Sequence, residues 1–236
     1  MSSIILEGRD IRYRYPRGLE AIRGISFHIR KGEKVAIVGP NGAGKSTLML
    51  LFNGMIRPDS GTMLFDNEPV RYDKSSLRMI RKRVGFVLQN PDRQIIAPTV
   101  YQDVAFGPTN LGYSESEVKA AVGEALRYVG LEGFERRPPH QLSGGEKKRV
   151  AIAGVLAMDP DVLVFDEPTA GLDPSGSEDI MDLLDELNQG GKTVIISTHD
   201  IELAYPWADR AILLLGGRIL QEDIPDVAFG RPDYVR

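Results

Sequence analysis

The stretch GPNGAGKST (39–47) carries residue types that can bind a phosphate group. It fits the pattern G-x-x-x-x-G-K-[ST] and directly follows the apolar run KVAIV (34–38). Its inner glycines let several backbone N–H groups point at one phosphate, and the helix that follows adds a partial positive charge. Lys45 can reach the β- and γ-phosphate oxygens, and the Ser46 hydroxyl can bind Mg²⁺. The alternative is a glycine-rich turn between a strand and a helix, but the pattern favours a nucleoside triphosphate site. The predicted binding residues are Gly39, Pro40, Asn41, Gly42, Ala43, Gly44, Lys45, Ser46 and Thr47.

Two carboxylates follow a second apolar run, in VLVFDEP (162–168). Open α/β sheets bind their ligands at the carboxyl ends of their strands, which is where this pair would lie. Asp166 is suited to hold Mg²⁺ through its water shell, and Glu167 could orient and polarise an attacking water. The alternative is a pair of solvated carboxylates in a loop. Beside a phosphate loop, the pair predicts a catalytic role.

A third stretch, LSGGEKKRVAIAGVLAM (142–158), predicts a helix that starts near Gly145 and continues to Met158. Ser143 and Glu146 have the spacing of a capping box, which is typical of an ordinary helix start. Two adjacent glycines serve no cap, however, and they lower helix propensity. They make sense if a phosphate must approach the backbone closely. From the residues alone, both interpretations stay open.

Strands that could position these residues alternate with helices along the chain. ISFHI (25–29) alternates apolar and polar residues, as a half-buried strand does, whereas KVAIV is continuously apolar after its lysine, as a strand covered on both faces would be. VLVF (162–165) and TVIIS (193–197) predict further strands, and the apolar stripe Ile180, Leu183, Leu184, Leu187 predicts a helix between them. Such alternation indicates an α/β fold with a mainly parallel sheet.

The middle of the chain is predicted to be helical. Ser114 and Glu117 have capping-box spacing, and Gly130 is placed to end the helix that they begin. Between them, one helical face carries Val118, Ala121, Val122, Ala125, Leu126 and Val129. This helical region looks like an insertion into the α/β core.

Composition limits the function classes. The net charge of −4 over 236 residues makes the chain a poor binder of polyanions, so we expect no nucleic acid partner. The absence of cysteine excludes disulfides and thiolate metal sites. No stretch approaches the about 20 apolar residues of a membrane span, and the N-terminus lacks the features of a signal peptide. Work at a membrane would therefore need another subunit.

Five motifs, GPNGAGKST, LSGGE, VLVFDE, AGLD (170–173) and STHD (197–200), occur in this order, and with them the chain resembles the ATP-binding subunits of ABC transporters. The resemblance implies a P-loop NTPase of α/β class: a single ABC-type domain over 1–236, with a RecA-like core plus an antiparallel β subdomain at about 1–90 and 159–236. A helical subdomain is expected at about 91–158. The implied cofactors are ATP and Mg²⁺.

The resemblance also implies an assembly. Two such domains pair head to tail, and each ATP lies between the phosphate loop of one chain and the LSGGE stretch of the other. The residues that would act in trans are Leu142, Ser143, Gly144, Gly145 and Glu146. The partner is expected to be a second copy or a related ATPase subunit.

Further roles follow from the same resemblance. Tyr15 matches the aromatic residue that stacks on adenine, with Tyr13 as the alternative, and either could simply pack on a strand. Gln89 matches the glutamine that touches Mg²⁺ or the attacking water. Asp173 matches the aspartate of the dimer-interface loop, and His199 matches the histidine that contacts the γ-phosphate. The Mg²⁺ site would thus comprise Ser46, Gln89 and Asp166, and the catalytic set Glu167, His199 and Gln89.

The apolar run VGFVLQ (84–89) predicts a strand that ends at Gln89, and the loop that follows indicates a subfamily. QNPDRQ (89–94) and APTVYQDVAFGPTNLG (97–112) are similar to the ATPases of energy-coupling-factor importers, which serve cobalt, nickel or vitamin uptake. This resemblance implies a peripheral subunit at the cytoplasmic face of the cell membrane, bound to a transmembrane coupling protein and a substrate-binding membrane subunit. Gln102 stands where an acidic residue is expected, and the chain ends soon after His199, so the partner contact and the make-up of the ATPase pair stay open.

Alternative functions are a soluble ABC ATPase that acts on DNA or ribosomes, an ATPase of another transporter class, and a regulatory subunit that binds ATP without hydrolysis. Chromosome-maintenance ATPases carry a long coiled coil between the phosphate loop and the LSGGE stretch, and no sustained heptads occur here. Translation-factor types usually fuse two domains. Lys45, Asp166, Glu167 and His199 are all present, which argues against a non-catalytic subunit.

Overall fold

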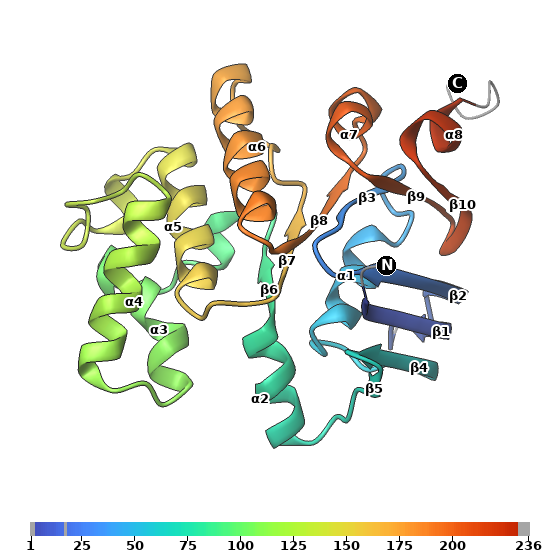
Figure 1. Ribbon diagram of the computed structural model, residues 1–236, viewed down its shortest axis with the longest axis horizontal. Coiled ribbons are helices and arrows are strands. Elements are labelled where there is room, and N and C mark those ends of the chain that lie inside the picture. The colour runs from blue at the N-terminus through green and yellow to red at the C-terminus, as the bar shows by residue number, and fades with distance from the viewer. Residues whose placement is uncertain (1–2, 17, 231–236) are drawn as a thin grey trace. The chain divides into compact units, whose positions relative to one another are not determined.

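The computed structural model describes residues 3–16 and 18–230, which belong to two compact units (Figure 1). The first unit comprises Met1–Arg81 and Leu187–Arg236, and the second comprises Lys82–Glu186. The expected helical subdomain at about 91–158 lies inside the second unit, and its existence as a separate body stays a prediction. Among the described residues, no helix combines the length and the apolar character that a bilayer crossing requires.

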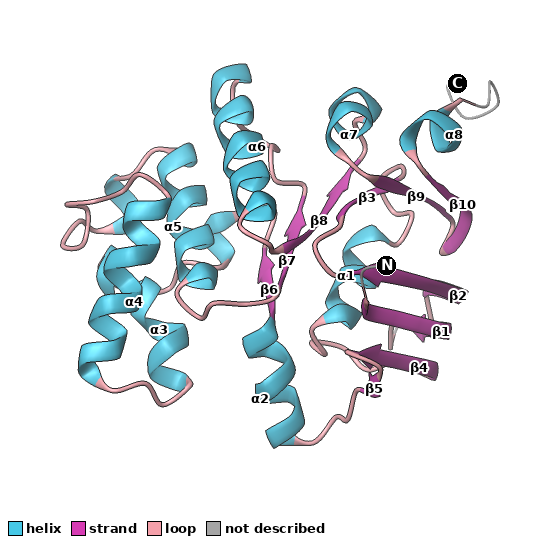
Figure 2. Ribbon diagram, viewed as in Figure 1, coloured by secondary structure: helices cyan, strands magenta, loops and turns pink. Residues whose placement is uncertain are grey.

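An antiparallel sheet forms one part of the first unit (Figure 2). Its strand order is β2-β1-β4-β5. The alternation predicted at 25–29 is confirmed, because Ile25, Phe27 and Ile29 are buried. Asp66 and Asn67 join β4 to β5 with positive φ angles of 54° and 65°, which is the backbone of a tight hairpin turn. The strands are β1 (Ile4–Arg14), β2 (Glu20–Arg30), β4 (Ser60–Phe65) and β5 (Glu68–Pro69).

The parallel strands of the first unit centre on β3 (Lys34–Val38). It pairs in parallel with β8 (Thr193–Thr198) on one side and with β9 (Arg210–Leu215) on the other, while β10 (Arg218–Asp223) runs antiparallel to β9. After Lys34, β3 is buried throughout, as its continuous apolar sequence predicts. The unit's complete helices are α1 (Lys45–Phe52), α7 (Ile201–Trp207) and α8 (Pro225–Phe229).

The second unit packs helices beside a parallel strand pair, β6 (Val84–Val87) and β7 (Val162–Asp166). Two of its helices, residues 100–110 and 144–156, approach each other at Gly107 and Gly154. A Cβ atom on Gly107 would lie 2.7 Å from the sulfur of Met158, so a side chain at this position would require the methionine to shift. The helices are α3 (Val100–Asn110), α4 (Glu115–Tyr128) and α5 (Gly144–Leu156), with short 3₁₀ turns η1 (Pro91–Arg93) and η2 (Pro139–Gln141). The unit boundaries fall within α2 (Lys74–Arg83) and α6 (Pro174–Gln189).

Both predicted capping boxes are present. Ser114 accepts the N–H of Glu117 at the start of α4, and Ser143 accepts the N–H of Glu146 at the start of α5; each glutamate accepts the backbone N–H of its serine in return. Helix α4 ends before Gly130, which has a φ angle of 71°, as predicted. Helix α5 occupies 144–156 rather than 145–158. All four residues of the stripe predicted on α6 are buried: Ile180, Leu183, Leu184 and Leu187.

One element differs from its prediction. Strand β6 ends at Val87, so Gln89 lies two residues beyond the strand rather than at its end. The physical reason lies in the next backbone group, because the N–H of Leu88 donates to the side-chain oxygen of Gln94 at 2.8 Å. A side chain from the loop thus takes the hydrogen bond that would have continued the ladder.

Candidate nucleotide and catalytic sites

The phosphate loop, residues 39–47, begins where β3 ends and closes at the start of α1. Gly42 and Gly44 have φ angles of 81° and 108°, in the left-handed region that favours glycine. Gly39 is needed for a different reason, since a Cβ atom there would lie 2.1 Å from the carbonyl oxygen of Leu214. Glycine is therefore required at these three positions for the loop to keep its path between strand and helix.

Lys45 lies over this loop rather than in solvent. Its side chain is buried, and its ammonium donates to the carbonyl of Gly39 at 2.7 Å and to that of Pro40 at 3.4 Å. Ser46, the next residue, is exposed. A cation held over a loop of this shape, at the positive end of a helix, can attract the phosphates of a nucleotide.

His199 directly follows strand β8 and lies next to the start of the phosphate loop. Val38 and Thr198 are register partners in the parallel pair β3–β8, so the chain continues into Gly39 and into His199 at the same edge. The Gly39 N–H donates to the carbonyl of Thr198 at 3.3 Å, which ties the two segments together. His199 is exposed, and Asp200 caps helix α7 immediately after it. The first unit thus brings the predicted γ-phosphate contact to the phosphate loop.

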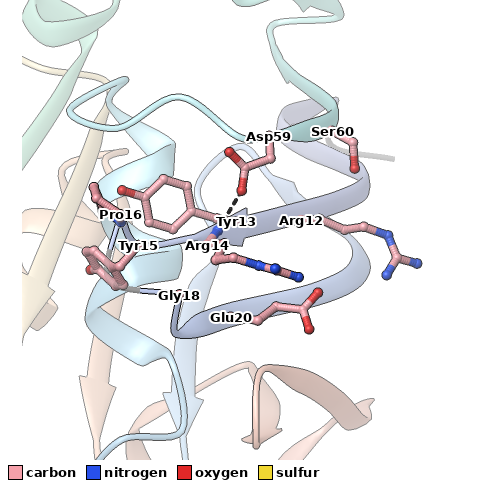
Figure 3. A pocket seen from close by; sticks show the side chains of 9 residues that line it. All are labelled: Arg12, Tyr13, Arg14, Tyr15, Pro16, Gly18, Glu20, Asp59 and Ser60. Carbon is pink, nitrogen blue, oxygen red and sulfur yellow. Dashed lines mark hydrogen bonds between the residues drawn. The ribbon is translucent and has the colours of Figure 1, made fainter.

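Tyr15 lies in the first unit and is connected to the phosphate loop. Its hydroxyl forms a 3.0 Å hydrogen bond with that of Thr47, and its ring meets Tyr13 edge-on with centroids 5.0 Å apart. Both tyrosines line a pocket of about 510 Å³ (Figure 3). In the same pocket, the carboxylate of Asp59 accepts the backbone N–H of Arg14 at 2.6 Å. The pKa of Tyr13 is raised above the usual value of a tyrosine, mainly because its hydroxyl is partly removed from water.

The acidic pair ends strand β7 in the second unit. Asp166 and Glu167 are buried, with 9% and 8% of their surfaces exposed. Glu167 has a φ angle of 47°, an uncommon backbone conformation for a residue with a side chain. Because β6 and β7 are parallel and Val87 pairs with Phe165, Gln89 and the acidic pair leave the strand pair at the same edge. Gln89 itself is exposed.

The signature, residues 142–146, forms the start of α5, which we call the signature helix. Leu142 is buried, while Ser143 and Gly144 are exposed. Hydrogen bonds from Ser143 lower the pKa of Glu146, so its carboxylate is held in the ionised form of the capping box. A Cβ atom on either glycine would meet no atom within 4 Å, and neither glycine has a left-handed φ angle.

Asp173 forms hydrogen bonds with the first turn of helix α6 in its own chain. Its carboxylate accepts the N–H of Gly176 at 2.9 Å, and its carbonyl accepts the N–H of Ser177 at 2.9 Å, so it caps helix α6. The residue is exposed. Its predicted role at a dimer interface stays a prediction.

No three His, Cys, Asp or Glu side chains gather into a metal-binding group in the described part of the chain. The predicted Mg²⁺ donors are a hydroxyl, an amide and a carboxylate: Ser46, Gln89 and Asp166. All three supply the hard oxygen ligands that Mg²⁺ prefers, and Mg²⁺ is commonly bound by few protein groups together with substrate phosphates. The donor types therefore fit the metal.

Sequence reasoning missed Lys148. This lysine is 2% exposed and donates to backbone carbonyls in the segment after Glu167. In the sequence it is the second lysine of EKKR and has no property that separates it from the first.

A sequence profile of the ABC transporter family matches residues 22–170, which include the phosphate loop, the signature and the acidic pair. The chain belongs to this family. Among its curated ABC transporter relatives, it is 65% identical to the energy-coupling factor transporter ATP-binding protein EcfA2 of Methanospirillum hungatei over 98% of the chain, and it spans 58% of that protein's length. It is 56% identical to EcfA of Methanocaldococcus jannaschii over 98% of the chain and 83% of the relative. Within the ABC transporter family, the chain belongs to the energy-coupling factor type.

Solved ABC transporter structures share its fold. CbiO1 of Clostridium perfringens, described as part of the ABC transporter complex CbiONQ, matches with a TM-score of 0.88 and 44% identity over 97% of this chain and 91% of that one. A dimeric ATP-binding cassette in a post-hydrolysis state, bound to ADP and Pi, matches with a TM-score of 0.84 and 33% identity over 94% and 99%. The predicted fold class and family are confirmed.

Proposed function

We propose that this chain hydrolyses ATP as a peripheral subunit of an energy-coupling-factor importer, at the cytoplasmic face of the membrane. The observation that carries the proposal is the phosphate loop, in which three required glycines shape the backbone and Lys45 is held over it by the carbonyls of Gly39 and Pro40. When nucleotide enters, the ammonium of Lys45 exchanges these carbonyls for phosphate oxygens, which bind it more strongly because they are charged.

Ser46, Asp166 and Gln89 would hold Mg²⁺ together with the phosphates. The ion supplies charge neutralisation on the β- and γ-phosphates. Asp166 is buried at the end of β7, so its carboxylate is held in place, whereas exposed Gln89 lies in a loop and can change position when the γ-phosphate leaves.

Glu167 is the proposed group that orients and polarises the attacking water. Its buried position shields it from bulk solvent, which strengthens its electrostatic effect on a nearby water. His199, at the edge of β3 and β8, would contact the γ-phosphate and stabilise the charge that develops on it. Tyr15 would stack on the adenine, with its ring fixed by the bond to Thr47.

The signature would act on the nucleotide of a second ATPase chain, either another copy or a related subunit. Within residues 3–16 and 18–230, nothing requires glycine at 144 and 145, because an added Cβ there would meet only open space. Glycine also lowers the stability of a helix start relative to most residues. The pair is explained if a phosphate of another chain approaches the backbone N–H groups at this helix terminus. Asp173, exposed at the start of α6, would lie at the same interface.

The loop after Gln89 is proposed to contact a transmembrane coupling protein. This docking segment, residues 90–108, runs from the loop into α3 and exposes two large apolar side chains, Ile96 at 70% and Phe106 at 56%. A pocket of about 260 Å³ lies next to Ile96 and is lined by Pro98, Pro139 and neighbouring residues. Its lining is mostly apolar but includes the Asp92–Lys147 ion pair, and such a hollow suits a short amphipathic helix from a partner. The cargo, whether cobalt, nickel or a vitamin, is bound by a separate membrane subunit in this proposal.

Phosphate release by the wild-type chain and by Glu167→Gln, each with Mg²⁺ and the membrane partner, tests the proposed activity. We expect the wild type to turn over at least about a hundredfold faster, because loss of a general base typically costs 10²–10⁴ in rate. Equal rates would contradict hydrolysis at this site. In the same preparation, Ile96→Asp should spare ATP binding but reduce recovery of the membrane partner, and equal recovery would contradict the docking surface.

A further inference from the structure

Lys148 is a buried cation for which the proposed reaction so far has no use. It lies on the signature helix, little more than one helical turn after the signature glycines. Its ammonium donates to the carbonyl of Pro168 at 2.6 Å and to that of Ala170 at 3.2 Å, and it lies 3.5 Å from the carbonyl of Glu167. A lysine has three N–H donors, so this set of three acceptors matches its full capacity.

A buried ammonium is costly to the fold unless its partners offset the lost hydration. Burial lowers the pKa of Lys148 to about 8, and the negative charge of Glu167 acts in the opposite direction. The negative charge of Glu167 therefore favours the charged form of Lys148 within the second unit. An apolar residue at position 148 would fill the space without this cost. The benefit of a lysine here must therefore lie in the backbone carbonyls that its ammonium binds.

The carbonyls that Lys148 binds belong to a short turn, residues 167–170, which has an uncommon backbone conformation. Glu167 is in the left-handed region, a conformation that is unfavourable for a residue with a side chain and persists only where surrounding contacts fix it. The N–H of Ala170 donates back to the carbonyl of Glu167 at 3.1 Å, which closes a turn. Lys148 binds carbonyls along this turn, and the turn leads directly to Asp173.

The signature helix also contacts the loop after Gln89. The side chain of Gln94 accepts the N–H of Leu88 at 2.8 Å and donates to the carbonyl of Ala151, on this helix, at 3.1 Å. The signature helix is therefore hydrogen-bonded to two functional segments. Gln94 connects it to the end of β6 before Gln89, and Lys148 connects it to the turn after Glu167.

We propose that Lys148 is a positioning residue for hydrolysis, which fixes the turn at residues 167–170 on the signature helix so that the Glu167 carboxylate keeps its reactive placement. The inference rests on the proposed ATPase function. It adds that the proposed base and the signature of one chain are held by the same helix, so they move together when a nucleotide of a second chain binds the signature.

The test compares Lys148→Met, Lys148→Arg and the control Lys119→Met, an exposed lysine on α4 of the same unit. Steady-state kinetics give kcat and KM for MgATP, and hydrogen exchange gives the protection of residues 168–173. The amides of Ala170 and Leu172 report on the turn, because both are hydrogen-bonded within it. Residues 115–128 of α4 serve as an internal reference.

We expect Lys148→Met to lower kcat at least about tenfold with KM changed less than about threefold, since misplacement of a catalytic group affects the chemical step. Exchange at 168–173 should be at least about tenfold faster, while α4 stays unchanged. Lys148→Arg, which keeps a cation with several donors, should recover part of both losses. The control should match the wild type in both measurements.

A purely structural role predicts otherwise: kcat would fall only in proportion to the folded fraction, and exchange would rise in α4 as well as in the turn. That result, or a Lys148→Met variant with wild-type kcat and protection, would overturn the inference. If Lys148→Met does not fold, Lys148→Arg and Lys148→Gln decide by the same measurements. A wild-type chain without ATPase activity would contradict the proposed function instead, and the exchange data would still show whether Lys148 fixes the turn.

Discussion

The phosphate loop and the signature are both glycine-containing starts of helices, but their glycines are required for different reasons. In the phosphate loop the chain itself demands glycine, through left-handed φ angles at Gly42 and Gly44 and through the contact of Gly39 with Leu214. At the signature, Gly144 and Gly145 have ordinary φ angles and open space around them. The first region is thus explained by one chain, whereas the second needs a ligand or partner from outside it.

The largest effect that separates the two regions is expected at Gly145. Gly145→Glu should lower ATPase activity at least about a hundredfold, because a carboxylate would repel the phosphate and block its approach to the helix terminus. The free energy of unfolding should stay the same or rise by up to about 1 kcal/mol, since the position is open and glycine is a poor helix residue. Activity assays and chemical denaturation measure the two quantities.

Gly123→Glu on α4 is the matched control, because Gly123 also has no atom within 4 Å of an added Cβ and lies in a helix. It should keep full activity and gain up to about 1 kcal/mol of stability, as glycine is a poor helix residue. Wild-type activity in Gly145→Glu would remove the distinction between the two regions.

Gly39→Ala should show the opposite pattern, with a loss of stability of about 1–3 kcal/mol, because its Cβ would overlap a backbone carbonyl that cannot move freely. ATP binding should weaken with it, since the path of the phosphate loop would change. Thermal unfolding and nucleotide titration check this pair of losses. A stable Gly39→Ala chain with normal ATP affinity would show that the loop tolerates a side chain.

The two capping boxes offer a smaller comparison within the second unit. Ser114→Ala and Ser143→Ala should each cost about 1 kcal/mol of stability, because each serine caps its helix in the same way. Only Ser143→Ala should also lower ATPase activity, measured at a temperature where both variants are folded. Equal activities would mean that Ser143 is a cap and nothing more.

The smallest expected effect is a change in how the free energy of unfolding depends on acidic pH. Glu146 has a folded-state pKa below the 4.5 of the free side chain, because Ser143 hydrogen-bonds its charged form. Its contribution to stability is therefore present above about pH 4.5 and is lost as the pH falls through the lowered folded-state pKa. On acidification from about pH 6 to about pH 3, the wild type should lose more stability than Glu146→Gln. Parallel unfolding curves would contradict this linkage.

Local patterns in the sequence predicted the phosphate loop, both capping boxes and the strands that carry the acidic pair, since each depends on residues close together in the chain. The end of β6 at Val87 could not be predicted, because it depends on the side chain of Gln94 taking the next hydrogen bond. Lys148 was missed for a similar reason. Its acceptors lie about 20 residues away, and only the fold brings them to the ammonium.

In the proposed assembly, the signature of one chain completes the nucleotide site of another. The molar mass of Glu167→Gln in solution, measured by light scattering with and without saturating MgATP, tests it most directly. MgATP should double the mass of this hydrolysis-deficient variant, and adding Gly145→Glu to the same chain should restore the single-chain mass while MgATP still binds. A nucleotide-loaded Glu167→Gln chain that stays monomeric both alone and when mixed with a related ATPase subunit, or a double variant that still dimerises, would contradict it.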